Sequence, residues 1–167
     1  MLENLLTLIK QHAGPAIIDN PAIPNDQNDT AISMAGHSIM DGLKNMLTSG
    51  KTGDVVNLFN NPGADIASTP AAQQISGGFI QSLMAKFGLG QNEASGIASG
   101  IIPEVLQRLV HKTNDPADSS FNLQGILSQL TGGGTGGLDL QGLMNKFTGS
   151  ATGGGGIGDT IKGFMGK

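Results

Sequence analysis

Gly50, Lys51 and Thr52 spell the end of a phosphate-binding P-loop, so nucleotide binding is the first chemistry to consider. The motif also requires a glycine five residues before Gly50, and Asn45 stands there. The preceding segment has helical apolar spacing, whereas a P-loop follows a strand, and we therefore predict a helix-ending turn. The glycines of residues 153–158 match a dinucleotide fingerprint by letter, but no strand leads into them and glycine is so frequent nearby that a chance match is expected.

The three histidines, His12, His37 and His111, are the next candidates, because imidazole is a common metal ligand. They fall on different predicted helices, and none has a second histidine within one turn. A histidine metal site would therefore have to be assembled by the fold. We interpret the three residues as helix-end or surface groups, and we predict no cofactor.

Asp26, Asn28 and Asp29 superficially resemble a calcium-binding loop. Such a loop needs glycine at its sixth position and glutamate at its twelfth, where this chain has Ala31 and His37. We interpret the three residues as helix-capping groups.

Catalytic motifs are missing from the sequence. No serine stands in a nucleophile elbow, there is no cysteine, and Glu3, Glu93 and Glu104 have no neighbouring carboxylate at helical spacing. We therefore expect no enzyme. The alternative is an enzyme or metal protein that uses a histidine with Asp115 or Asp118, although turn formation explains these two aspartates better.

Charge and glycine content divide the 167 residues near Ser120. Residues 1–120 carry 11 acidic and 6 basic side chains, residues 121–167 carry 2 and 3, and 15 of the 27 glycines fall in the second part. We predict one domain over residues 1–120 and a glycine-rich tail over residues 121–167. The negative charge of the first part has the wrong sign for a phosphate backbone, so we do not expect nucleic-acid binding.

The chain has no cysteine, which excludes disulfides and is compatible with a reducing compartment. Its first ten residues read MLENLLTLIK, with an acid before the only base, which is not typical of a signal peptide. No segment holds the roughly 20 apolar residues that a membrane span needs. We expect a soluble, cytoplasmic protein with no transmembrane segment.

Helical periodicity is strongest over residues 92–112, which we predict to be the central helix. Asn92 is its expected cap, and Pro103 predicts a bend just after Gly100. Small residues on its polar side (Gly96, Ser99 and Gly100) indicate internal helix packing in preference to an interface. The apolar face is formed by Ala94, Ile97, Ala98, Ile101, Ile102, Val105, Leu106, Leu109 and Val110.

The remaining elements are also predicted to be helical, so the fold class is all-α. A short first helix begins at Leu2 and stops before Gly14, residues 17–29 form an extended connector, and Asn25 or Asp26 caps a helix that ends at Gly50. We predict a short helix over residues 54–60, although the two adjacent valines would also tolerate a strand. A further helix starts at Thr69 and Pro70, ends at Gly88 and leads by a tight connector into the central helix.

A family resemblance supports this architecture. It is carried by residues 43–59, LKNMLTSGKTGDVVNLF, and by three groups in the last two helices: Lys86, Phe87, Gly88 and Leu89; Ala94, Ser95, Ile97 and Ala98; Ile102, Pro103, Val105 and Leu106. Residues 35–112 thus resemble the YidB-like family of bacterial proteins, whose function is undetermined. The resemblance implies a multihelical domain with a homeodomain-like helix arrangement, brings no catalytic residues, and does not include the glycine-rich tail.

The tail contains a decapeptide that recurs every 17 residues: LQGILSQLTG at 123–132, LQGLMNKFTG at 140–149 and IGDTIKGFMG at 157–166. We name these repeat one, repeat two and repeat three. Glycine-rich spacers of seven residues separate them. A helix of ten residues is marginal in water, so each repeat needs an apolar partner. The predicted interaction residues are Leu123, Ile126, Leu127, Leu130, Leu140, Leu143, Met144, Phe147, Ile157, Ile161 and Phe164.

Several partners fit these repeats: the helical domain of residues 1–120, which we call the body, the tail of another protomer in a homo-oligomer, a different protein, or a lipid interface. Disorder is a further alternative. We predict a non-enzymatic helical scaffold whose repeats mediate self-association or partner binding. A nucleic-acid-binding helical domain and a metal-binding or enzymatic protein are the alternatives.

Overall fold

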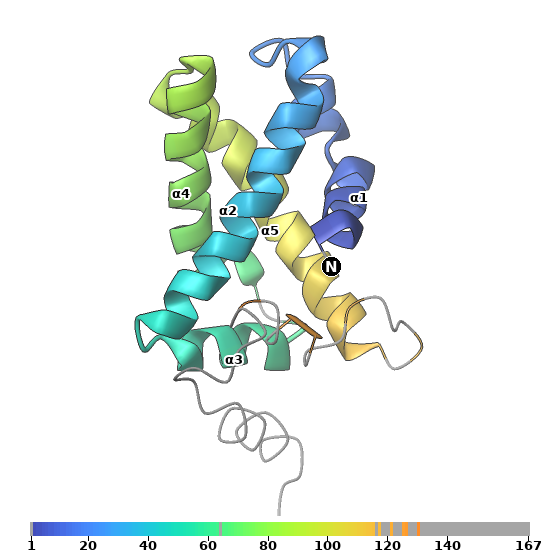
Figure 1. Ribbon diagram of the computed structural model, residues 1–167, viewed down its shortest axis with the longest axis vertical. Coiled ribbons are helices and arrows are strands. Elements are labelled where there is room, and N and C mark those ends of the chain that lie inside the picture. Colours follow the sequence, from blue (N-terminus) through green and yellow to red (C-terminus); the bar gives the residue numbers. More distant parts are fainter. Residues whose placement is uncertain are drawn as a thin grey trace, which may run out of the picture. The chain divides into compact units, whose positions relative to one another are not determined.

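Helix α5, Gln91–Asn114, is the element around which the other helices pack in this computed structural model. The structure describes residues 2–63, 65–115, 117, 121, 125, 126 and 130. Helix α5 contacts three helices, α1 (Leu2–His12), α3 (Thr52–Asn60) and α4 (Pro70–Phe87), and two short helical segments, η1 (Gly14–Ile18) and η3 (Ile66–Ser68) (Figure 1). The nine apolar residues predicted for its buried face are the nine that are buried, so that prediction is confirmed. The helix continues without interruption through Pro103.

The start of α5 differs from the prediction. Gly90 is the residue before the helix, and Glu93 Oε2 accepts a hydrogen bond from the Gly90 backbone N–H at 3.0 Å. Asn92 lies inside the first turn of α5, so the prediction that it caps the helix is wrong. Glu93 satisfies one N–H group at the helix start, and its charge suits the positive end of the helix dipole.

Helix α4, Pro70–Phe87, forms a hairpin with α5. Its start is confirmed, because Thr69 Oγ1 accepts a hydrogen bond from the Ala72 N–H at 3.2 Å and Pro70 occupies the first helical position. Its end is also confirmed, because Gly88 adopts a φ of 66°, a left-handed conformation that favours glycine. Three residues therefore suffice for the reversal into α5.

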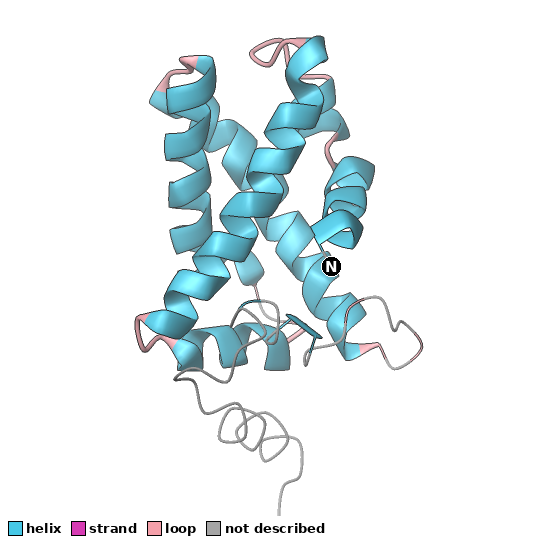
Figure 2. Ribbon diagram, viewed as in Figure 1, coloured by secondary structure: helices cyan, strands magenta, loops and turns pink. Residues whose placement is uncertain are grey.

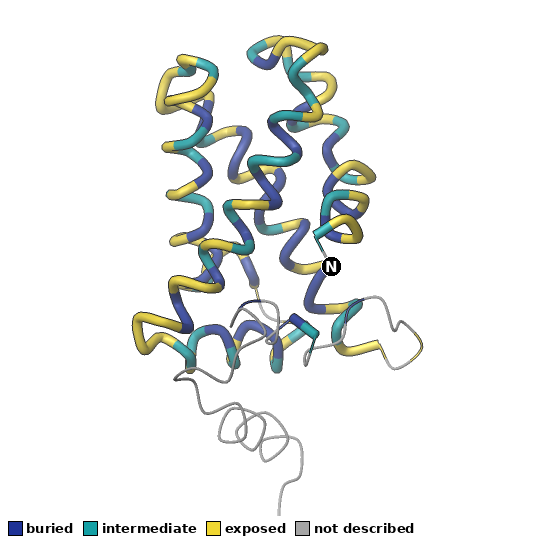
Figure 3. The backbone as a smooth tube through the Cα atoms, in the orientation of Figure 1, coloured by how far each residue is buried: buried dark blue, intermediate teal, exposed yellow. Residues whose placement is uncertain are grey.

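Helix α2, Asn28–Thr48, lies against α4 on one side and α1, Leu2–His12, on the other (Figure 1). Close approach is possible because two glycines face these neighbours. A Cβ atom at Gly42 would overlap Ile75 Cγ1 of α4, and one at Gly36 would lie 2.8 Å from Leu6 Cδ2 of α1. Helices α1 and α4 each contact both α2 and α5, so the four helices enclose one core. Buried positions line their inward sides (Figure 3).

The prediction of an extended connector between α1 and α2 is wrong. Gly14–Ile18 (η1) forms one turn of π-helix and Asn25–Gln27 (η2) one turn of 3₁₀-helix, so the segment is not simply extended. Ile17 and Ile23 are buried, and this burial draws the chain into helical turns. Neither Asn25 nor Asp26 caps α2, because Gln27 stands before its first residue and makes no side-chain capping bond.

Helix α3, Thr52–Asn60, confirms the helical interpretation of residues 54–60. It is followed by η3, Ile66–Ser68, which packs against both α4 and α5. Within the described part of the chain every regular element is helical and there is no strand, which confirms the all-α prediction at this level (Figure 2). No helix among the described residues has the length and apolar content needed to cross a bilayer.

The five α-helices belong to a compact unit that comprises Met1–Gly136. Three described residues that follow α5 lie in the same unit, and Phe121, Ile126 and Leu130 are each buried, with 4%, 2% and 3% of their surface exposed. The boundary predicted near residue 120 rests on composition and stays a prediction. The homeodomain-like arrangement also stays a prediction.

Candidate functional site

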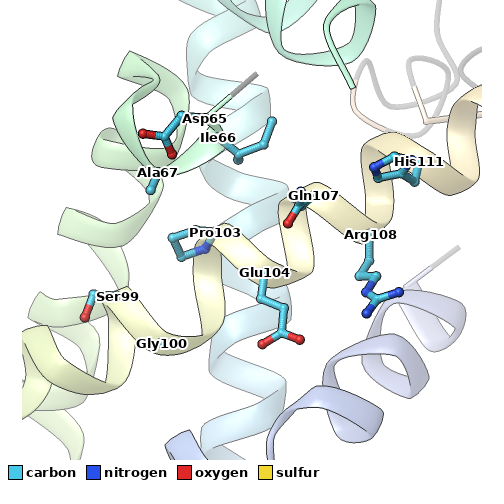
Figure 4. Close-up of a pocket in the computed structure, with 10 residues that line it drawn as sticks. All are labelled: Asp65, Ile66, Ala67, Ser99, Gly100, Pro103, Glu104, Gln107, Arg108 and His111. Atoms are coloured by element: carbon cyan, nitrogen blue, oxygen red, sulfur yellow. The ribbon is translucent and has the colours of Figure 1, made fainter. Parts of the chain in front are cut away.

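A groove of about 650 Å³ lies over the outward face of α5 (Figure 4). One wall is the polar side of α5 and the other is η3 with the residue before it. The size is within the range of ligand pockets. The lining residues are Asp65, Ile66, Ala67, Ser99, Gly100, Pro103, Glu104, Gln107, Arg108 and His111.

Helical periodicity places the α5 side chains in this groove. Because the inward face of α5 is apolar, residues three or four positions apart on the other side, from Ser99 to His111, share the outward face. Ile66 holds η3 against α5, since its side chain is only 4% exposed. Figure 4 shows Asp65 and Ala67 on the η3 side and Ser99, Pro103 and Gln107 along α5.

Both signs of charge occur in the groove. Glu104 Oε1 lies 2.9 Å from His12 Nδ1 of α1, and the Asp65 carboxylate accepts a hydrogen bond from Ser68 Oγ at 2.6 Å. Arg108 and His111 occupy the last two turns of the same face. The carboxylates are therefore engaged with neighbouring side chains, and the groove has the mixed character of a recognition surface.

Gly100 and Pro103 are part of the lining of the groove, whereas Gly96 is not. A Cβ atom at Gly100 would lie 3.4 Å from Ala16 Cβ of η1, so Gly100 does serve internal packing. Gly96, in contrast, has no neighbouring atom within 4 Å of such a position. Pro103 has no N–H to donate to the Ser99 carbonyl, which is therefore left without its usual helical partner.

The histidines considered in the sequence lie on three different helices, α1, α2 and α5. His12 pairs with Glu104, and His37 Nδ1 lies 2.7 Å from the Ser33 carbonyl oxygen, to which its N–H donates. The described residues contain no group of three or more His, Asp or Glu side chains that could hold a metal ion.

The other motifs also have structural roles. Gly50, with a φ of 81°, lies in the turn after α2, which confirms a helix-ending turn at the Gly-Lys-Thr sequence. Asp29 Oδ1 pairs with Lys10 Nζ at 2.8 Å, between α2 and α1. Asp115 Oδ1 accepts a hydrogen bond from the Ala117 N–H at 2.9 Å, as expected of a turn. Asp118 and the glycines of residues 153–158 lie outside the described residues.

Two of the predicted interaction residues are described, and both are buried: Ile126 and Leu130 of repeat one. The chain already returns to the body at Phe121, which shares a cavity of about 170 Å³ with Leu8 of α1 and Lys112 of α5. Lys112 Nζ lies 6.0 Å from the centre of the Phe121 ring. The residues that lie outside the described part are Leu123, Leu127, Leu140, Leu143, Met144, Phe147, Ile157, Ile161 and Phe164.

Sequence reasoning did not find the groove or the His12–Glu104 pair. The pair joins residues 92 positions apart, and one wall of the groove comes from η3, far from α5 in sequence. The available signal is the cluster of small residues and proline on the polar side of α5, for which we predict internal packing. Gly100 does pack against η1, whereas Gly96 has no such neighbour.

Comparison with protein-family models, with curated proteins and with solved structures finds no match to this chain. The resemblance to the YidB-like family therefore stays a prediction.

Proposed function

We propose that this protein is a non-enzymatic helical scaffold whose tail repeats bind an apolar partner, and that a second molecule of the same chain is one such partner. The observation that carries the proposal is the burial of Ile126 and Leu130, at 2% and 3% exposure. These residues occupy the fourth and eighth positions of repeat one. Burial at these two positions is expected of a short amphipathic segment that depends on a host surface, and it supports the proposal.

The physical reason is the short length of each repeat. Ten residues give few hydrogen bonds to offset the cost of nucleating a helix, so a stable repeat must gain free energy from apolar burial. Repeats two and three keep the apolar residues at the fifth and eighth positions: Met144 and Phe147, then Ile161 and Phe164. These two repeats are the natural candidates for contacts between molecules.

The body is suited to a scaffold role. Among the described residues only two large hydrophobic side chains are exposed, Ile18 at 42% and Met84 at 37%, and they lie on different elements. Single exposed hydrophobic residues are normal on soluble surfaces. The body therefore contributes a closed framework and a polar groove, and the proposed apolar adhesion comes from the tail. The lack of cysteine fits a reducing compartment, and we keep the cytoplasm as part of the proposal.

Nucleic-acid binding is less well supported. Arg108 and His111 share their groove with the carboxylates of Asp65 and Glu104, which would repel a phosphate backbone. Retention on DNA that weakens as salt is raised would favour that alternative over the scaffold.

Light scattering over a range of protein concentrations tests the proposal. The full chain is compared with a chain ending at Ser120 and with a full-length variant that carries Phe147→Asp and Phe164→Asp. We expect the mass of the full chain to rise with concentration, while the other two remain monomeric. Equal monomer masses for all three at high concentration would remove self-association from the proposal.

A further inference from the structure

We propose that the groove over α5 binds a short extended peptide with free ends, whose ammonium group lies at Asp65 and whose carboxylate lies at Arg108 and His111. The proposal goes beyond the scaffold function, because every residue that it uses belongs to the described part of the body and none to the tail. It joins two observations: the two ends of the groove carry opposite charge, and the guanidinium at one end has no partner among the described residues.

The two ends of the groove differ in the charge that they present. Asp65 lies at the end where α5 contributes Ser99, and Arg108 and His111 lie at the other end (Figure 4). A ligand with one positive and one negative end is therefore complementary to the groove in a single orientation. A polyanion is not complementary, because the carboxylates of the lining would repel it.

Arg108 is an exposed cation that makes no hydrogen bond or ion pair with any described residue. Glu104 stands four residues before it on α5, a spacing at which opposite charges usually pair. Glu104 Oε1 instead lies 2.9 Å from His12 Nδ1. The guanidinium of Arg108 is therefore available to a carboxylate from outside the body, which it can bind through two parallel hydrogen bonds.

Asp65 is oriented by its neighbour at the opposite end. Its Oδ2 atom accepts a hydrogen bond from Ser68 Oγ at 2.6 Å, which restricts the rotation of the carboxylate. An ionised carboxylate has about four acceptor sites, so this one bond leaves Asp65 able to accept hydrogen bonds from an ammonium group.

The middle of the groove suits a peptide backbone, which offers N–H donors and C=O acceptors in turn. The Gln107 side chain carries both a donor and an acceptor and makes no hydrogen bond with a described residue. The Ser99 carbonyl adds an acceptor, because Pro103 cannot supply its usual donor. Pro103 and Ala67 present small apolar surfaces to which methyl side chains can pack.

The length of the groove favours a peptide over a single amino acid. Twelve residue steps of α5 separate Ser99 from His111, which is about 18 Å along the helix axis. Five residues of extended chain span a similar length, about 17 Å. In a free amino acid the ammonium and carboxylate groups are bonded to the same carbon atom, so they cannot reach both ends of the groove.

Nuclear magnetic resonance of the isotope-labelled full chain tests the proposal, with penta-alanine as the probe. We expect millimolar penta-alanine to shift the backbone amide resonances of residues 99–111 and of η3. Arg108→Gln should weaken binding at least about tenfold, because it removes a charge-assisted bidentate contact. Lys86→Gln removes an exposed positive charge from α4, outside the groove, and as the matched control should leave the affinity unchanged.

Two modified peptides assign the ends. Penta-alanine with a C-terminal amide lacks the carboxylate, so it should bind the parent and the R108Q variant equally weakly. N-acetylated penta-alanine lacks the ammonium group. Asp65→Asn should therefore weaken binding of the unmodified peptide and leave binding of the acetylated peptide unchanged.

No shift in the groove with millimolar penta-alanine, or equal affinity for the parent and R108Q, overturns the proposal. Free alanine that binds as tightly as penta-alanine, or sulfate that causes the same shifts, would also overturn it in favour of a simple anion site. Asp65 and Arg108 are exposed, so both variants should melt at the temperature of the parent. Arg108→Lys is a second variant that keeps the charge but not the paired hydrogen bonds, and its affinity should lie between those of the parent and R108Q.

Discussion

Helix α5 and repeat one are both amphipathic, but they obtain their stability in different ways. The 24 residues of α5 bury nine apolar side chains against α1, α3 and α4 and against η1 and η3. Repeat one has ten residues, of which Ile126 and Leu130 are described and buried. A long helix surrounded by partners is part of a cooperative core, whereas a segment of ten residues forms few hydrogen bonds of its own. The comparison teaches that the same kind of apolar pattern stabilises α5 through many partners, whereas a ten-residue repeat depends on the surface that covers it.

The largest effect is expected from a cavity in the face of α5. Leu106 is fully buried, so Leu106→Ala should lower the free energy of unfolding by about 2–5 kcal/mol, measured by urea denaturation. The exposed neighbour Gln107 is the matched control, and Gln107→Ala should change stability by no more than about 0.5 kcal/mol. Similar values for the two variants would mean that α5 is not the cooperative centre of the body.

Close packing between α2 and α4 gives the next effect. A methyl group at Gly42 would overlap Ile75 Cγ1, so Gly42→Ala should destabilise the body by about 1–3 kcal/mol despite the better helix propensity of alanine. Gly77 is the control, because no atom lies within 4 Å of the position where its Cβ would stand. Gly77→Ala should stabilise α4 by about 0.5–1 kcal/mol. A gain in both variants would show that α2 and α4 separate easily.

Repeat one should respond differently from α5 to the same kind of truncation. Although Leu130 is only 3% exposed, Leu130→Ala should lower the free energy of global unfolding by only about 1 kcal/mol or less, because the loss cannot exceed the free energy of docking. Hydrogen exchange should accelerate at residues 125–130 and stay unchanged within α5. A loss as large as that of Leu106→Ala would make repeat one part of the core and break the comparison.

The sequence was most informative where many residues share one periodicity. All nine buried positions of α5 follow the helical pattern, and the start of α4 at Thr69 and its end at Gly88 follow from local capping chemistry. Local rules failed where several polar residues competed for one role. Asn92, Asn25 and Asp26 are all good caps in isolation, but tertiary packing selected helix starts at other residues.

The candidate site was harder to predict because it is made by long-range contacts. The groove forms because η3, with Ile66, packs beside the part of α5 that contains Pro103. The apolar periodicity of one segment gives no information about its contact with the other. The tail shows the opposite case. Its repeats are evident in the sequence, and burial of Ile126 and Leu130 adds that two of the predicted interaction residues are covered within the compact unit.

The smallest effect is expected on the outward face of α5, at the pair between Glu104 and His12. Glu104→Gln removes the carboxylate charge from a hydrogen-bonded contact in which Glu104 is 46% and His12 20% exposed, so stability should change by no more than about 1 kcal/mol. A double-mutant cycle with His12→Asn isolates the pair, and unfolding by urea is again the measurement. A coupling energy well above that limit would mean that the outward face helps to hold α1 on α5. A small value would assign the cohesion of the body to the apolar face of α5 and leave the groove side chains free to be altered without loss of the fold.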